Sequence, residues 1–210
     1  MSADRYALDL IVLVPGKDDS KAIEGLLTRH NSLRIRQFEY EINIHPQKDA
    51  GCYKVGVDFL RSQTKRVKHA LIVFDHEGSG VEDKAVDEIE QELRYKLNIS
   101  GWEDRADVLV IEPEIERWIW SDSPHVDEEL GWKEKRPNLR TWLTGKNYIV
   151  NNDVKPNKPK EAMEQALRTA QIPRTSDIYF QLASKVTLTQ CIDPSFNKLK
   201  SILTKWFGVS

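Results

Sequence analysis

The chain has 210 residues and a formal net charge of −2; 30% of its residues are charged and 40% belong to the apolar set AVILMFWYC. This length suits one compact domain with an appendage, and this balance excludes a disordered chain. No apolar run reaches the roughly 18 to 20 residues of a membrane span, and the first run, residues 10–15, lacks the basic flank of a signal peptide. We therefore expect a cytoplasmic protein with no membrane contact.

Charge is distributed unevenly along the chain. Residues 81–130 contain 16 Asp or Glu and 5 Lys or Arg, a net charge of −11. Residues 131–160 contain 8 Lys or Arg and 2 Asp or Glu, a net charge of +6. An acidic segment therefore precedes a basic one.

Strands and helices alternate in the first half of the chain. Residues 6–14 are apolar and β-branched and stop at a Pro-Gly pair, which predicts a central strand that ends in a tight turn. Asp18 and Asp19 are typical of the first turn of a following helix. Residues 33–44 alternate strictly in polarity, so we expect a second strand at the edge of the sheet.

The same reasoning applied to the rest of the chain predicts strands at 70–74 and 107–111. Helical spacing predicts helices over 53–65, 81–97, 114–120 with Pro113 in the first turn, 161–172 and 195–206, with a loop over 151–160. Residues 175–190 fit no single pattern.

This order predicts an α/β fold with a doubly wound, mostly parallel sheet of about four strands, flanking helices and a helical C-terminal tail. We assign residues 1–122 to the α/β core and residues 123–210 to a basic loop and helical extension packed on the same domain. Sites in such folds lie at the carboxyl ends of the strands.

Acidic residues follow three of the predicted strands. Asp18 and Asp19 follow the first, Asp75 and Glu77 follow the third, and the fourth is followed by Glu112, Glu114 and Glu116. Because these ends converge in a parallel sheet, the carboxylates are suited to a hard divalent cation such as Mg²⁺ or Mn²⁺. Gly78 and Gly80 allow the loop to turn. The alternative is that the acids only cap helices and cover a solvated face.

Other chemistry has little support in the sequence. The histidines lack ligand spacing, and His76 between the two acids points to the opposite side of an extended segment. Cys52 and Cys191 have no metal-ligand spacing and are expected to be reduced and structural. There is no phosphate-binding P-loop motif, so we expect no nucleotide cofactor bound by this chain alone.

Three segments in order, VPGKDD, FDHEGSG and EPEIERWIW, resemble the Toprim fold of topoisomerases, primases and OLD-type nucleases over roughly residues 6–122. The segments are most similar to small stand-alone Toprim-like proteins of bacterial antiviral defence islands, and the similarity extends to KPKEA and DPSF in the tail. Among these proteins, the sequence resembles the small Toprim-like component of a methylation-associated defence system. The resemblance implies partners among the other proteins of such a system.

Carried over residue by residue, the resemblance implies metal ligands at Asp75, Glu77 and Glu116 and catalytic roles for Asp75 and Glu77. Asp18 or Asp19 is the nearby substitute for a family glutamate that this sequence lacks, and we expect Asp19 in that catalytic role. Glu77 replaces the second aspartate of the family motif. Pro15 stands where the family places a glutamate that binds metal or transfers a proton, a step that contributes about 10²- to 10⁴-fold in rate. This departure implies weakened or absent catalysis.

Nucleic-acid contacts are expected at Lys17 and, in the basic segment, at Lys133, Arg136 and Arg140, with Trp132 and Trp142 available to stack on bases. The alternative is a solvated face or a surface for a partner protein. Trp118 and Trp120 are expected in the core.

Two functions follow from the sequence. The first is a Mg²⁺-dependent nuclease-type enzyme of antiviral defence, and the second is a degenerate Toprim scaffold that binds partner proteins.

Overall fold

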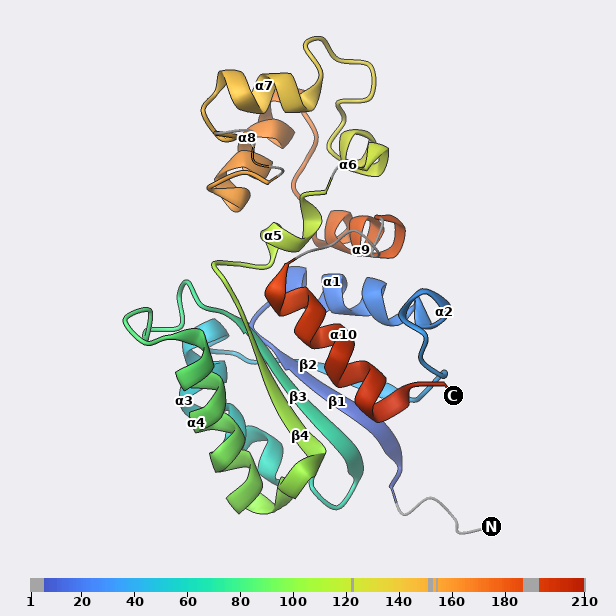
Figure 1. Cartoon of the computed structure of the whole chain (residues 1–210), viewed down its shortest axis with the longest axis vertical. Helices are drawn as coiled ribbons and strands as arrows, with labels where there is room; N and C mark the ends of the chain where they lie inside the picture. The colour runs from blue at the N-terminus through green and yellow to red at the C-terminus, as the bar shows by residue number, and fades with distance from the viewer. Residues whose placement is uncertain (1–5, 122, 151–152, 154, 187–192, 210) are drawn as a thin grey trace.

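The computed structural model describes residues 6–121, 123–150, 153, 155–186 and 193–209. Within these residues the strands form one four-stranded sheet of order β2-β1-β3-β4, in which every neighbouring pair is parallel. The strands are β1 (Leu8–Val14), β2 (Tyr40–Ile44), β3 (Val67–Asp75) and β4 (Ala106–Ile111). The predicted α/β fold with a parallel sheet is confirmed (Figure 1).

Helices cover both faces of the sheet (Figure 1). One face packs against α3 and α4, and the other packs against α1 and α10. The helices of the α/β part are α1 (Lys17–Leu27), α2 (His30–Leu33), α3 (Lys48–Arg61) and α4 (Val86–Leu97), followed by the short turns η1 (Asn98–Trp102) and η2 (Glu103–Arg105). The remaining helices are α5 (Glu116–Ile119), α6 (Pro124–Glu129), α7 (Leu139–Gly145), α8 (Pro159–Ala170), α9 (Ser176–Lys185) and α10 (Pro194–Phe207).

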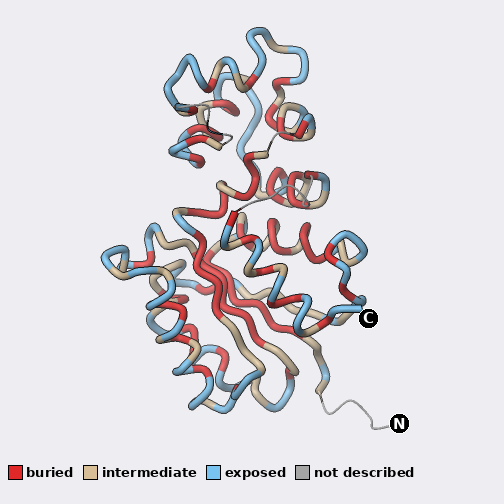
Figure 2. The backbone as a smooth tube through the Cα atoms, in the orientation of Figure 1, coloured by how far each residue is buried: buried red, intermediate tan, exposed pale blue. Residues whose placement is uncertain are grey.

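The two central strands are apolar on both faces. In β1, Leu10 and Val12 belong to the apolar cluster beneath α1 and α10, whereas Ile11 and Leu13 belong to the cluster beneath α3 and α4. Successive side chains of a strand point to opposite faces, so a sheet covered twice requires this continuous apolar run. Figure 2 shows the resulting buried centre of the sheet.

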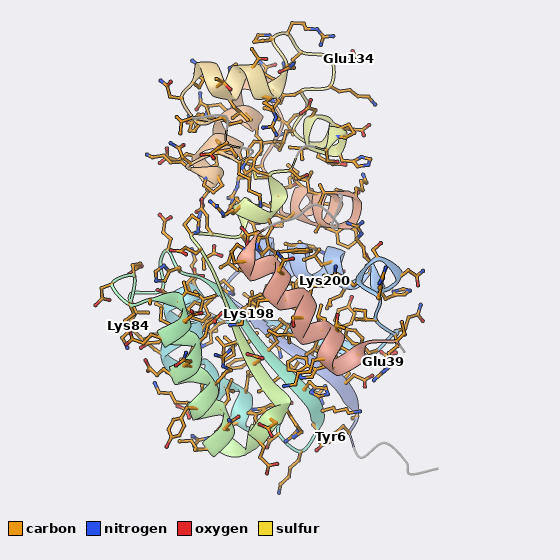
Figure 3. The ribbon with its side chains drawn as sticks, in the orientation of Figure 1. Tyr6, Glu39, Lys84, Glu134, Lys198 and Lys200 are labelled. Carbon is orange, nitrogen blue, oxygen red and sulfur yellow. The ribbon has the colours of Figure 1, made fainter. Side chains whose placement is uncertain are left out.

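The C-terminal part of the chain divides its helices between two places. Helices α6, α7 and α8 lie beyond α5, away from the sheet, and Glu134 marks their far end (Figures 1 and 3). Helices α9 and α10 return to the α/β part, where α9 packs on α1. This contact is close, because a Cβ on Gly25 would lie 2.6 Å from the carbonyl oxygen of Phe180. One continuous apolar cluster joins both groups of helices to the sheet.

The predicted strand over 33–44 is wrong in its first half. Leu33 ends α2, and Arg34 has a left-handed backbone with φ of 56°. The segment then pairs with the C-terminus: Arg36 N donates to Phe207 O at 2.8 Å, and Val209 N donates to Arg34 O at 3.2 Å. Tertiary pairing with the chain after α10 thus replaces pairing with β1.

Other helix boundaries also differ from the prediction. Helix α3 begins five residues before 53, and α4 begins at Val86 because Ala85 has extended backbone angles. Pro113 lies before α5 rather than in its first turn. Part of the predicted 151–160 loop, and Cys191, lie outside the described residues, whereas Cys52 is buried and free. No helix in the described ranges is long and apolar enough to cross a membrane.

Candidate metal centre

Acidic side chains follow all four strands where the strands end. Asp19 lies in the first turn of α1 after β1, Asp49 lies in the first turn of α3 after β2, and Asp75 is the last residue of β3. Glu114 and Glu116 follow β4. The parallel order of the strands brings these five carboxyl groups to one edge of the sheet. We call them the acidic centre.

Three of these carboxyl groups each have one buried oxygen without a hydrogen-bond partner among the described residues. Asp19 is 7% exposed and Glu116 is 2% exposed. Within the described part of the chain, Asp19 Oδ1, Asp75 Oδ1 and Glu116 Oε2 are buried and accept no hydrogen bond. A buried polar atom without a partner costs about 1–3 kcal/mol, more if charged, so three of them at one edge call for an explanation. A hard divalent cation, which prefers oxygen ligands, would provide these three oxygens with a partner.

The pKa values of these acids show that they act on one another. Burial first, and then repulsion from Asp49 and Glu116, raise the pKa of Asp19 to about 7. Burial also raises the pKa of Asp75 well above its usual range, followed by repulsion from Asp19 and Asp49. The pKa of Glu114 is raised to about 7 by burial and then by Glu116. Binding of a cation here would release protons.

The backbone positions the acids through local features of the sequence. Asp49 Oδ1 accepts a hydrogen bond from the backbone N–H of Asp75 at 3.0 Å, which ties α3 to the end of β3. Gly16 leaves room for Asp19, whose Oδ2 would lie 3.1 Å from a Cβ at that position. Gly78 and Gly80 have positive φ angles of 86° and 79°, as the predicted turn requires.

Two basic residues of the C-terminal extension border the acidic centre. Arg174 Nη2 lies 2.7 Å from Asp18 Oδ2 and 3.5 Å from Glu116 Oε1. Lys160 Nζ lies 3.9 Å from Glu114 Oε2, and its backbone N–H donates to Glu114 Oε1 at 2.8 Å. The centre thus contains carboxylates in excess and two cations at its border.

Glu114 and Glu116 are both part of the centre. Glu114 is only 6% exposed, and it precedes α5 rather than lying on it. Its Oε1 accepts the N–H of Lys160, at the beginning of α8. Glu114 therefore stabilises the first turn of a helix that is distant in sequence.

The structure brings together Asp19, Asp75 and Glu116 but leaves Glu77 at the rim. Glu77 is exposed and contributes to the raised pKa of Glu114. Lys17 is exposed at the first position of α1.

The donor set fits Mg²⁺ or Mn²⁺ chemically, since carboxylate oxygens are the preferred ligands of hard cations. Among the described residues, however, no three acidic, histidine or cysteine side chains already converge on one point at which a metal ion would be held. Carboxylates repel one another, so binding a cation requires side-chain rotations that draw them together.

Lys160, at the end of the basic segment, borders the acidic centre, but the earlier basic residues of the segment lie apart from it. Lys133 pairs with Glu128 at 3.1 Å, and Arg136 Nη1 donates to the carbonyl oxygen of Lys135 at 2.8 Å. Arg140 lies in α7 beside Leu139, in the group of helices beyond α5. The expected nucleic-acid contacts of these residues thus lie outside the acidic centre.

Burial limits the expected aromatic stacking. Trp132 is 2% exposed and donates its Nε1–H to Ala166 O at 3.2 Å, so it is not available to stack on a base. Trp118 and Trp120 are 7% and 3% exposed, and their predicted place in the core is confirmed.

Sequence reasoning missed Asp49, Lys160 and Arg174. Asp49 follows the second strand as the other acids follow theirs, but the expected helix began five residues too late to show this. Arg174 gave no local signal, because only the packing of α9 on α1 brings it to the centre.

Comparisons with protein families, with curated proteins and with solved structures find no match to this chain. The resemblance to Toprim proteins therefore stays a prediction from short motifs. The structure shows the α/β fold with its parallel sheet.

Proposed function

We propose that the protein is a Toprim-like, Mg²⁺- or Mn²⁺-dependent enzyme that hydrolyses phosphodiester bonds of nucleic acid, as a component of bacterial antiviral defence. The observation that supports this most is the set of unpartnered buried oxygens on Asp19, Asp75 and Glu116. These atoms come from three different strand ends, as the ligands of a cation site would.

In this proposal Asp75, Asp19 and Glu116 hold the cation, and Glu77 at the rim reaches it through its longer side chain. The cation supplies Lewis-acid activation of a phosphoryl oxygen and of a bound water. Asp49 orients the end of β3 by accepting the N–H of Asp75. Glu114, with a pKa raised to about 7, is suited to hold or give up a proton near neutral pH.

The test is the substitution Asp75→Ala in the purified protein. We expect the parent to bind Mn²⁺ in calorimetry and to cleave DNA or RNA with Mg²⁺ or Mn²⁺, and Asp75→Ala to lose both. The exposed Asp83→Ala is the matched control and should retain both. Metal-dependent cleavage that is unchanged in Asp75→Ala would disprove this assignment.

A second candidate is a catalytically degenerate scaffold that binds partner proteins of the defence system. Pro15 supports it, because a buried proline stands where the related motif has a carboxylate. This candidate predicts that the parent binds Mn²⁺ without turnover on plasmid, single-stranded DNA or RNA substrates. Robust turnover would contradict it.

A further inference from the structure

Arg174 is bound to the acidic centre by several polar groups at once. Its Nη2 donates to Asp18 Oδ2 at 2.7 Å and to Tyr179 OH at 2.8 Å. Tyr179 OH in turn donates to Glu116 Oε1 at 2.5 Å. Ser176 Oγ donates to Asp18 Oδ1, also at 2.5 Å. The guanidinium is therefore held in place by residues of both α1 and α9.

This network leaves one oxygen of Glu116 unused. Oε1 accepts from Tyr179 and lies 3.5 Å from Arg174, whereas Oε2 is buried and has no hydrogen-bond partner in the part of the chain that the structure describes. The Glu116 side chain is 3% exposed, but that of Arg174 is 36% exposed. Arg174 is thus the solvent-accessible partner of a buried carboxylate.

Lys160 is a second cation at the same border. Its side chain is 50% exposed, while that of its neighbour Glu114 is 8% exposed. Glu116 acts on both cations: its charge acts on Lys160 together with those of Glu114 and Asp75, and its Oε1 lies 3.5 Å from Arg174 Nη2. Both come from the C-terminal extension rather than from the α/β part.

Arginine suits the recognition of a phosphate group. Its planar guanidinium presents several N–H donors in a fixed fork that matches phosphate oxygens, and lysine adds a compact charge. A cation held by the carboxylates on one side and Arg174 with Lys160 on the other would flank a phosphodiester with positive charge.

We propose that Arg174 and Lys160 bind the phosphate of a nucleic-acid strand at the acidic centre, with Asp18 and Tyr179 as the residues that position Arg174. This inference rests on the proposed function and names the substrate-binding half of its site. The substrate phosphate then contacts α8 and the residues before α9, rather than Lys133 and Arg136 beyond α5.

The test measures binding of a fluorescein-labelled oligonucleotide by anisotropy with Ca²⁺, and Mn²⁺ affinity by calorimetry. Single-stranded DNA, duplex DNA and RNA of equal length distinguish the strand that is bound. Arg174→Gln should weaken oligonucleotide binding roughly tenfold or more, since a charge-assisted contact is lost. Arg174→Lys, which keeps the charge but not the fork, should weaken it less.

The matched control is Arg168→Gln, which removes the same charge from an exposed position near the end of α8. Loss of one positive charge weakens nucleic-acid binding in general, and Arg168→Gln should change oligonucleotide affinity by less than about twofold in addition to that effect. Mn²⁺ affinity should be retained in Arg174→Gln, because the carboxylates remain, and its melting curve checks that it is folded.

The two proposals fail differently. Oligonucleotide affinity of Arg174→Gln equal to that of Arg168→Gln, with Mn²⁺ still bound, would overturn the role of Arg174 alone. A parent protein that binds neither Mn²⁺ nor oligonucleotide would overturn the proposed function as well.

Discussion

Asp19 shows how the acidic centre lowers the stability of the folded protein. It is buried beside other carboxylates, and its Oδ1 has no hydrogen-bond partner. Its pKa is about 7 in the folded protein, against an ordinary value of 3.8. The folded protein therefore binds this proton more tightly than the unfolded chain does. The stability that the protonated form provides is complete below about pH 4 and is lost as the pH rises through about 7.

Removing the charge of Asp19 should reverse this loss. In EDTA, Asp19→Asn should be more stable than the parent by about 1–3 kcal/mol at pH 8, and the difference should shrink towards pH 5. Unfolding in guanidinium chloride at several pH values measures it.

The exposed Asp58→Asn provides the control and should show no such trend. Comparing variant with parent also removes the opposite contribution of His69, whose pKa is lowered to about 4 by burial. A destabilised Asp19→Asn at pH 8 would contradict the expected repulsion.

Strand β4 shows how one element of the sheet is protected at its edge. It is the last strand in the order β2-β1-β3-β4. Glu90 of α4, which is 1% exposed, accepts the N–H of Val110 with Oε1 at 3.0 Å. Its Oε2 pairs with Lys198 of α10, which Figure 3 shows on the side of α10 towards β4. Glu90 therefore provides a hydrogen-bond acceptor for a backbone N–H of the edge strand and links helices on opposite faces of the sheet.

Glu90→Ala should destabilise the protein by about 2–4 kcal/mol, because it leaves the Val110 N–H and the Lys198 ammonium without this acceptor. Glu90→Gln should cost less, since the amide oxygen still accepts from Val110. Equilibrium unfolding in urea gives the values.

The neighbouring exposed Glu88→Ala should stay within about 0.5 kcal/mol of the parent. Equal effects of the substitutions at 88 and 90 would show that the edge contact contributes nothing.

The whole molecule has a core that crosses the boundary between the α/β part and the extension. The cluster beneath α1 and α10 contains Leu10 and Val12 of the sheet together with Trp132, Leu143 and other residues of the helices beyond α5. Parts that share apolar packing tend to unfold together.

We therefore expect one cooperative thermal transition. The unfolding midpoint from far-ultraviolet circular dichroism should equal the midpoint from tryptophan fluorescence. This should hold in two variants, one that lacks Trp102 beneath α4 and one that lacks Trp132. Two separated midpoints would show instead that the helices beyond α5 unfold on their own.

Local pattern was enough for much of the fold. The apolar runs of β1, β3 and β4 predict buried parallel strands, because residues covered on both faces must be apolar without alternation. The acids at 19, 75 and 116 were also expected at one edge, since parallel strands end together. The prediction of a strand failed at residues 34–36, because alternation does not specify whether the partner is β1 or the C-terminus.

Tertiary structure decided the rest of the site. Arg174, Tyr179 and Lys160 lie far from Glu116 and Glu114 in sequence, and only the return of α9 to α1 and the place of α8 bring them to the acids. Tertiary packing likewise decided that Glu114 is a buried group with a raised pKa. The sequence alone determined which strand ends are acidic; long-range packing determined which cations border them, because no local pattern encodes contacts between distant segments.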